Sequence, residues 1–363
     1  MFERIAEKVR GQRGIEPEEA LWLLTEGELL PLGRLADRVR RRMHPEGRVS
    51  FVVDRNVNYT NVCESRCRFC AFYRSEGDAD AYLLDRGEII AKIEELVAQG
   101  GTQLLMQGGL HPALGIEFFE GLFREIKGRF PGVQNHSLSP AEITHIAKVS
   151  GLTMPQVLAR LKEAGLDSVP GGGAEILVDR VRRKIAPLKG GADKWLEVME
   201  AAHEEGMRST GTMMFGITET LAERVEHFRV LREQQDRALA RGNGGGHTAF
   251  VAWPFQSGHT VWEGKVPKPT DDEYLRTIAV ARIYLDNFPH VQSSWVTMGR
   301  KTGQAALHYG CDDMGSLMLE ENVVSAAGTC HSVNKDEMLR MIRSAGFEPW
   351  QRDNVYGTVD WAP

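Results

Sequence analysis

The feature that most constrains the fold is a repeated alternation of short apolar segments with longer amphipathic ones. We expect strands at 51–54, 102–107, 133–136, 167–169, 209–214, 248–253, 291–296 and 323–325. Segments with helical periodicity separate them, and some begin with a capping pair such as Asp85 with Glu88 or Thr153 with Gln156. Since neighbouring parallel strands need long crossover connections, this order predicts an α/β fold with a parallel sheet. About eight such units predict a closed (β/α)8 barrel of the TIM type.

The first 48 residues have a different pattern. Apolar positions such as Ile5, Val9 and Leu35 are separated by charged residues, which is typical of amphipathic helices. We therefore expect residues 1–48 to form an N-terminal helical cap segment and residues 49–363 to form the barrel domain.

Composition and charge exclude several classes of protein. The chain has 363 residues, of which 42% are hydrophobic and 26% charged, so it can bury a large core. The net charge is -6, and no run of basic residues with interleaved aromatics appears, so we expect no nucleic-acid partner. No apolar stretch reaches membrane-spanning length and no signal-peptide pattern is present, so we expect a cytoplasmic protein with no membrane partner.

Three cysteines, Cys63, Cys67 and Cys70, follow the first expected strand at short spacing. Three thiolates so close together can hold three corners of a [4Fe–4S] cluster and leave the fourth iron open to a reactant. A structural zinc site is less favoured, because such sites usually pair two knuckles or add histidines. A disulfide is disfavoured by the odd total of five cysteines. Cys311 and Cys330 could supply a fourth ligand, but we interpret both as ordinary small buried thiols.

Active sites of such barrels lie at the C-terminal ends of the strands, and several polar or flexible residues are expected there. Gln107, Gly108 and Gly109 follow the second strand, and two glycines let a backbone approach a ligand closely. The remaining candidates are His136 and Ser137 after the third strand, Glu175 after the fourth, Asp286 just before the seventh, and Glu321.

The C-x-x-x-C-x-x-C run, with Phe69 before its last cysteine, resembles the radical S-adenosylmethionine (SAM) superfamily. Residues 54–63 and 70–74 narrow the resemblance to the branch that contains the futalosine-pathway enzymes of menaquinone biosynthesis and the deazaflavin synthases. Within that branch the sequence is most similar to enzymes that cyclise dehypoxanthine futalosine. The resemblance extends from about residue 50 to about residue 330. It departs at Asp312, where asparagine is expected, whereas Asp313 matches.

The resemblance implies the cofactors and partners. Cys63, Cys67 and Cys70 would hold a [4Fe–4S] cluster, and S-adenosyl-L-methionine would bind beside it. An external reductant such as flavodoxin or ferredoxin would supply the electron, and the small-molecule substrate would be dehypoxanthine futalosine. The residues that would contact S-adenosylmethionine are Phe69, Gln107, Gly108, Gly109, Ser137 and Glu175.

The implied reaction needs further groups. Asp286, Glu321 or His136 would act as the base that removes a proton when the aromatic ring is restored. An arginine or lysine, not identified by the sequence, should meet the substrate carboxylate. Two alternatives remain. One is a sibling activity, aminofutalosine synthase or a deazaflavin (FO) synthase subunit; the other is a non-catalytic iron–sulfur or zinc-stabilised binding protein.

Overall fold

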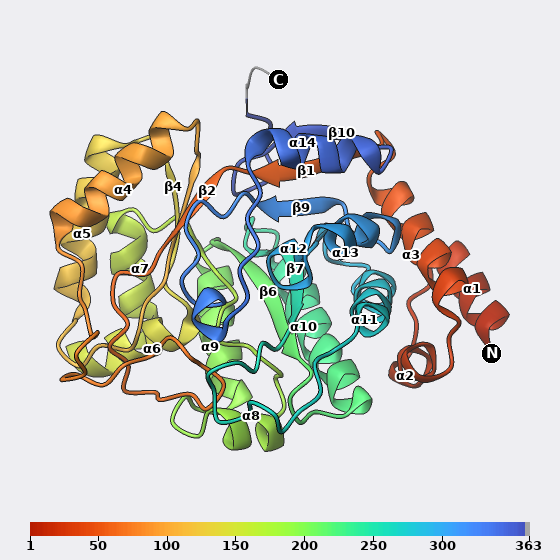
Figure 1. Cartoon of the computed structure of the whole chain (residues 1–363), viewed down its shortest axis with the longest axis horizontal. Coiled ribbons are helices and arrows are strands. Elements are labelled where there is room, and N and C mark those ends of the chain that lie inside the picture. Colours follow the sequence, from red (N-terminus) through yellow and green to blue (C-terminus); the bar gives the residue numbers. More distant parts are fainter. Residues whose placement is uncertain (360–363) are drawn as a thin grey trace.

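The sheet of this protein is a single parallel sheet that curls into a barrel with helices around its outside (Figure 1). We describe residues 1–359 of the computed structural model. Ten strands run in the order β10-β1-β9-β8-β7-β6-β5-β4-β3-β2. Their bounds are β1 Arg48–Val52, β2 Asp54–Val57, β3 Gln103–Met106, β4 Gln134–Ser137, β5 Ser168–Val169, β6 Arg208–Phe215, β7 Gly246–Pro254, β8 His290–Gln292, β9 Asp313–Ser316 and β10 Glu348–Gln351.

The barrel closes through strands β1 and β2, which are two parts of one run of chain interrupted only at Val53. Strand β1 pairs with β9, and β2 pairs with β3, so the two ends of the sheet meet in this run. Strand β10 pairs with β1 in addition, from Arg48↔Glu348 to Phe51↔Gln351. The predicted (β/α) barrel is therefore confirmed, with β10 as an added strand.

Helices connect consecutive strands, as parallel pairing requires. Asp85 and Thr153 open their helices with the predicted capping boxes, and Gly165 ends the second of these in the left-handed conformation. The helices of the barrel are α4 Arg86–Ala98, α5 Ile116–Arg129, α6 Pro140–Ser150, α7 Met154–Ala164, α8 Asp179–Ile185, α9 Ala192–Glu204, α10 Leu221–Arg241, α11 Asp271–Tyr284, α12 Trp295–Met298, α13 Arg300–Ala305 and α14 Lys335–Ser344, with short 3-10 turns η1 Ala306–His308 and η2 Ser325–Ala327.

The expectations for the last strands were partly wrong. Residues 323–325 form no strand: the first two lie in the loop before η2 and Ser325 begins η2. The eighth barrel strand is β9, earlier in the chain. The seventh strand stops at Gln292, and α12 begins three residues later. Short apolar runs do not distinguish a strand from a helix by periodicity, which is why α12 was taken for strand.

Three helices precede the barrel: α1 Phe2–Arg10, α2 Pro17–Thr25 and α3 Leu29–Met43. Helix α3 packs against α11 on the outer side of the barrel (Figure 1). Its buried face includes Leu32, Leu35 and Val39. The division of the chain at residue 48 stays a prediction. Among the described residues, no helix combines the length and the apolar character needed to cross a bilayer.

Candidate active site

A cavity of about 420 Å³ occupies the interior of the barrel. Its mouth is lined by the cysteine loop and by loops that follow the other strands, and its floor by residues of the C-terminal segment after β10. This is the position in which barrel enzymes carry their active sites.

All three clustered cysteines line this cavity. Cys67 is buried, Cys63 and Cys70 are partly buried, and all three are free thiols. Arg74 fixes the loop that carries them: its Nη1 donates to the carbonyl oxygens of Ala71, Phe72 and Tyr73 at 3.1, 3.3 and 2.9 Å. Its backbone carbonyl also accepts from the Cys63 N–H at 3.0 Å. The loop is thus preorganised with its sulfur atoms toward one space.

The chemistry of these thiols fits a metal cluster. Burial raises the pKa of Cys67 to about 11 and also raises that of Cys70, so without a cation the thiols would stay protonated. A bound iron cluster compensates the thiolate charge that burial otherwise disfavours. The three residues could hold three irons of a [4Fe–4S] cluster.

Gly108 and Gly109 line the cavity directly beside the cysteine loop. A Cβ at Gly109 would lie 2.1 Å from the Val62 carbonyl oxygen, and one at Gly108 would lie 2.7 Å from the Tyr59 ring. The glycines therefore let this turn pack against the loop that holds Cys63. Glu142, which sequence reasoning missed, fixes the turn by accepting hydrogen bonds from Gly108 N–H and Tyr59 Oη, both at 2.9 Å.

Lys189 is a second residue that the sequence did not identify. It lines the cavity, and its Nζ lies 5.3 Å from the centre of the Phe69 ring. The Glu175 carboxylate lies 2.9 Å from this Nζ. Burial lowers the pKa of Lys189, but the charge and hydrogen bond of Glu175 outweigh burial and hold that pKa above its ordinary value. Glu175 also lies 3.5 Å from Arg182.

The structure brings some of the predicted residues together and separates others. Besides the cysteines and glycines, Phe69, Gln107, His136 and Glu321 line the cavity. The backbone carbonyl oxygen of Gln107 accepts a hydrogen bond from Asn58 Nδ2 at 3.0 Å. The two oxygens of Glu321 accept the N–H groups of Val323, Val324 and Ser325, at 2.9, 2.6 and 2.7 Å, so this carboxylate also organises its own loop.

Three predicted site residues do not line the cavity. Ser137 is adjacent to His136 on β4, so its side chain points to the opposite face, where it donates to Asn135. Glu175 lies behind Lys189 and is committed to two cations, which leaves it to position Lys189 rather than to bind ribose. Asp286 lies in the loop before β8, at the N-terminal end of the strand, and pairs with Arg232 at 2.9 Å. This position keeps Asp286 away from the cavity lining.

The floor of the cavity comes from a segment that the sequence analysis did not consider. After β10, Arg352, Asn354 and Tyr356 all line the cavity. Arg352 Nε donates to Asp313 at 2.5 Å, and Asn354 Nδ2 donates to Ser168. The segment therefore bridges β9 and β5 across the barrel and closes its lower end.

Two further polar residues face the cavity just above this floor. Asp54 accepts hydrogen bonds from Gln103 Nε2 at 3.1 Å and from Ser316. Burial raises the pKa of Asp54 to about 6, despite these hydrogen bonds and the nearby Arg352. Gln103 Oε1 has no hydrogen-bond partner among the described residues, so it is available to a ligand donor.

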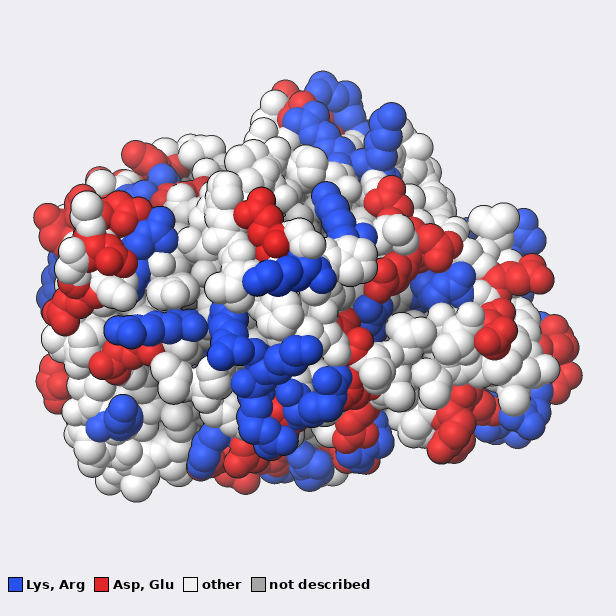
Figure 2. All heavy atoms as spheres, turned by 60° about the horizontal axis from the view of Figure 1, so that its bottom comes forward, with Lys and Arg blue, Asp and Glu red and all other residues white. Residues whose placement is uncertain are grey.

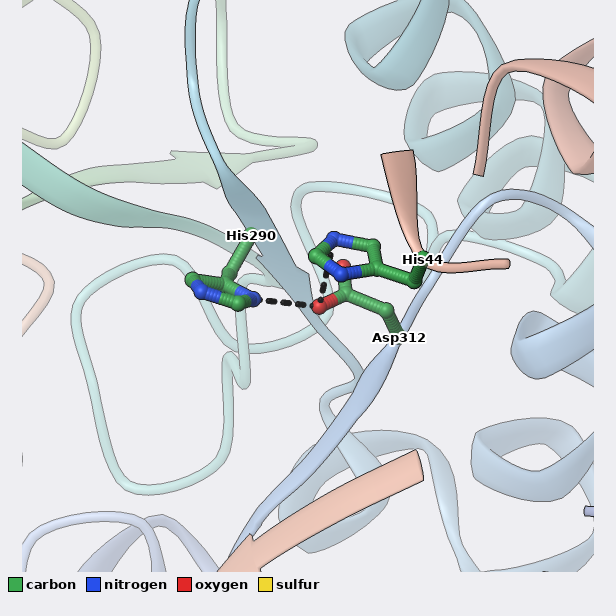
Figure 3. A group of neighbouring side chains, drawn as sticks. All are labelled: His44, His290 and Asp312. Carbon is green, nitrogen blue, oxygen red and sulfur yellow. Dashed lines mark hydrogen bonds and ion pairs between the residues drawn. The ribbon is translucent and has the colours of Figure 1, made fainter. Parts of the chain in front are cut away.

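Below the floor, His44 and His290 converge on Asp312 (Figure 3). The ligating atoms of the three side chains lie within 4.8 Å of one another, a spacing that a metal ion could use. However, buried Arg282 already donates to Asp312, and His44 Nε2 contacts the Pro289 carbonyl at 2.8 Å. Because the guanidinium supplies the positive charge that a cation would bring, we interpret this group as a hydrogen-bond network. It ties α3 to β8 and β9.

Fold and site together define a radical SAM barrel enzyme: three cysteines on one loop open into the mouth of a parallel barrel. Comparisons with known proteins agree. Residues 57–231 match the radical SAM superfamily, and residues 244–363 match the CofH/MqnC C-terminal region.

Curated relatives resemble nearly the whole chain. It is 46% identical to cyclic dehypoxanthine futalosine synthase of Halalkalibacterium halodurans, over 97% of this chain and 93% of the relative. The protein of the same name from Streptomyces coelicolor is also 46% identical, over 94% and 85%. Aminodeoxyfutalosine synthase of Thermus thermophilus is 40% identical, over 98% and 94%.

Solved structures share the fold at low sequence identity. Methylornithine synthase matches with a TM-score of 0.74 at 16% identity, over 95% of this chain and 97% of that one. The FeFe-hydrogenase maturase HydG of Carboxydothermus hydrogenoformans matches with a TM-score of 0.75 at 16% identity, over 98% and 80%. The chain belongs to the radical SAM superfamily, within the group that carries the CofH/MqnC C-terminal region. Its cofactors are a [4Fe–4S] cluster and S-adenosylmethionine.

Proposed function

We propose that the chain converts dehypoxanthine futalosine to its cyclic form in menaquinone biosynthesis. The observation that carries this proposal is the 46% sequence identity to two proteins named cyclic dehypoxanthine futalosine synthase. It is combined with a cysteine triad that opens into a cavity of substrate size. The five free thiols fit a reducing cytoplasm.

The cluster supplies, when reduced and bound, the electron that splits S-adenosylmethionine into methionine and a 5′-deoxyadenosyl radical. In the proposed reaction the substrate would lose the hydrogen atom at ribose C4′. The carbon radical adds to the benzoate ring, and loss of one electron and one proton restores the aromatic ring. The residues of this chain must therefore hold two reactants in line, exclude water and accept one proton.

Two cations among the described lining residues can meet the carboxylates of the reactants. Lys189 lies beside Phe69 on the cysteine side, and we assign it to the carboxylate of S-adenosylmethionine. Arg352 lies on the floor, and we assign it to the benzoate carboxylate. Its Nε and Nη1 donate to Asp313 and to the Asp353 carbonyl. Nη2 forms no hydrogen bond with a described residue, so we assign it to the substrate.

Asp54 is the best-supported proton acceptor. Glu142 is held by Tyr59, Gly108 and Ser139, and Glu321 by its own loop. The pKa of His136 is lowered to about 3 by burial, so its imidazole accepts a proton poorly. Asp54 lines the cavity with a pKa of about 6, close to the pH at which such a base works best.

The test is an anaerobic assay of the reconstituted protein with dithionite, S-adenosylmethionine and dehypoxanthine futalosine. The proposal expects 5′-deoxyadenosine and a product about two mass units lighter than the substrate, since one hydrogen atom and one proton with an electron are lost. Formation of an adduct from an enolpyruvyl substrate would instead identify an aminofutalosine synthase, and a protein that releases no 5′-deoxyadenosine would not be an enzyme of this class.

A further inference from the structure

Exposed cations gather around the cysteine loop at the mouth of the barrel. Arg66 and Arg68 flank Cys67 on the loop itself, and both side chains are exposed. Arg183 and Lys184 are exposed on α8, and Lys265 is exposed on the loop after β7. Figure 2 shows lysine and arginine side chains gathered on the face that carries α8. We call these five residues the cluster-loop surface.

The five residues come from three segments that contact one another. Arg68 donates from its backbone N–H to Ile185 at 2.8 Å and from Nη1 to the Lys184 carbonyl at 3.4 Å. Lys184 Nζ in turn lies 5.6 Å from the centre of the Trp262 ring. The Lys265 N–H donates to the Trp262 carbonyl at 2.9 Å. The surface is therefore one continuous patch built on the cysteine loop.

Its charge is largely uncompensated within the described part of the chain. Arg66, Arg68, Lys184 and Lys265 form no ion pair with a described carboxylate, and Arg183 has a weak one at 3.4 Å with Asp179. The same segments carry three acids, Glu64, Asp179 and Glu263, so the five cations remain in excess. Asp179 accepts the Ala192 N–H, and Glu263 accepts the His259 N–H, both at 2.9 Å. A positive patch on a chain of net charge -6 points to an anionic partner.

Apolar side chains accompany the charge. Leu188, which follows α8, is 66% exposed, and Val261 in the loop after β7 is 56% exposed. Both belong to the segments that form the patch. Exposed apolar side chains within a ring of like charges are typical of a small, transient protein interface, where charge steers and apolar contact holds.

We propose that the cluster-loop surface docks the acidic protein that donates electrons to the cluster. This inference rests on the proposed function, because it requires a cluster held by Cys63, Cys67 and Cys70. The donor gives up one electron, and the cluster is reduced by one electron from the 2+ to the 1+ state. Arg66 and Arg68 flank Cys67, so a protein that neutralises them approaches the cluster as closely as the loop permits.

The test compares two reductants on one charge-reversed variant. In the variant, Arg183→Glu, Lys184→Glu and Lys265→Glu are combined, which leaves the cysteine loop intact. Reduced flavodoxin is the protein probe, dithionite is the small-molecule reductant, and release of 5′-deoxyadenosine is the readout. The matched control reverses three exposed cations on α3 and α14 that have no ion pair with a described carboxylate: Arg34→Glu, Arg38→Glu and Arg343→Glu.

We expect the flavodoxin-driven rate of the variant to fall at least about tenfold at limiting flavodoxin, because complementary charges set the association rate. The dithionite-driven rate should stay unchanged, and the control should keep both rates. The wild-type flavodoxin-driven rate should also fall as salt rises from about 50 to 300 mM, because salt screens surface charges.

Three results would overturn the proposal. One is a variant that accepts electrons from flavodoxin as well as the wild type. Another is a variant whose dithionite-driven rate falls with a raised KM for the futalosine substrate, because the patch would then steer the anionic substrate. The third is a wild-type protein without 5′-deoxyadenosine release under dithionite, which would overturn the proposed function and the docking with it.

Discussion

Lys189 Nζ lies 2.9 Å from a carboxylate oxygen of Glu175, and the pair is almost completely buried beside the cysteine loop. Glu175 thereby fixes the one cation that lines the mouth of the cavity among the described residues. The sequence suggested that Glu175 contacts the cofactor; the structure makes it the residue that positions Lys189.

Replacing this carboxylate should impair cofactor binding. In Glu175→Gln, Lys189 loses its partner, and we expect the KM for S-adenosylmethionine to rise about tenfold or more, since a charge-assisted contact is weakened. Removing one member of a buried pair also costs about 3–5 kcal/mol of stability, which thermal melting would register. The control is Asp179→Asn, at an exposed residue of α8. A raised KM for the futalosine substrate alone would show that Lys189 holds that reactant instead.

The cysteine triad gives the second prediction. Cys67→Ala should lose most of its iron and reduce 5′-deoxyadenosine release by at least about 100-fold, because two thiolates do not hold a cluster with one open iron. Cys330→Ala is the matched control, since Cys330 is exposed, contrary to the expectation of a buried thiol, and does not line the cavity. Iron and sulfide analysis checks both variants, and undiminished cleavage in the Cys67 variant would contradict the site.

Asp54 gives a prediction about pH. Its carboxylate must be deprotonated to accept a proton, so the turnover rate should rise as pH increases through about 6, the raised pKa of Asp54. Asp54→Asn keeps the shape but cannot accept the proton, and we expect a loss of roughly 100-fold in product formation. Release of 5′-deoxyadenosine should persist, because it precedes the proton transfer. Glu321→Gln serves as the comparison, and a greater loss there would move the role of base to Glu321.

The network below the floor predicts a stability effect. Arg282 and Asp312 are both buried and bonded to each other. Burial would raise the pKa of Asp312, but Arg282 and His290 outweigh it and hold the pKa below its ordinary value. Asp312→Asn should therefore destabilise the fold by about 3–5 kcal/mol, seen as a lower melting temperature. The double variant with Arg282→Met should recover part of that loss. If the stability losses of the two single variants simply add in the double variant, Arg282 and Asp312 do not stabilise each other.

Buried histidines make the fold sensitive to acid. Burial lowers the pKa of His136 and His227 to about 3 and that of His203 to about 4. The unfolded chain therefore binds more protons than the folded chain below the ordinary histidine pKa of about 6.5. Stability should be complete above that pH and decrease as pH falls from it toward 3, by about 1.4 kcal/mol per pH unit for each histidine.

Three carboxyls act in the opposite direction. Burial raises the pKa values of Asp54, Glu142 and Asp286, so acid favours their folded forms and they offset part of the effect of the histidines. Melting temperatures between pH 7.5 and 5.5 test this. His227→Gln should flatten the dependence, whereas the same change at exposed His308 should not. An equal slope in all three proteins would contradict the assignment.

The sequence by itself determined the barrel and the cluster site. Strand and helix alternate with distinct periodicities, and local capping pairs such as Asp85 with Glu88 act within one turn, so both can be recognised from neighbouring residues. The cysteines are close in the chain, and their chemistry depends on that spacing alone. The strand predicted at residues 323–325 was wrong, because a short apolar run does not distinguish a strand from a helix or a turn.

Only the tertiary structure decided which side chains share the cavity. Ser137 and His136 are neighbours in the chain but point to opposite faces of β4, because successive residues of a strand alternate. Arg352 reaches the site from near the C-terminus, since β10 pairs with β1 and carries the following segment beneath the barrel. Lys189 enters it because Glu175 holds it there. Such contacts join residues far apart in sequence, and no local pattern encodes them.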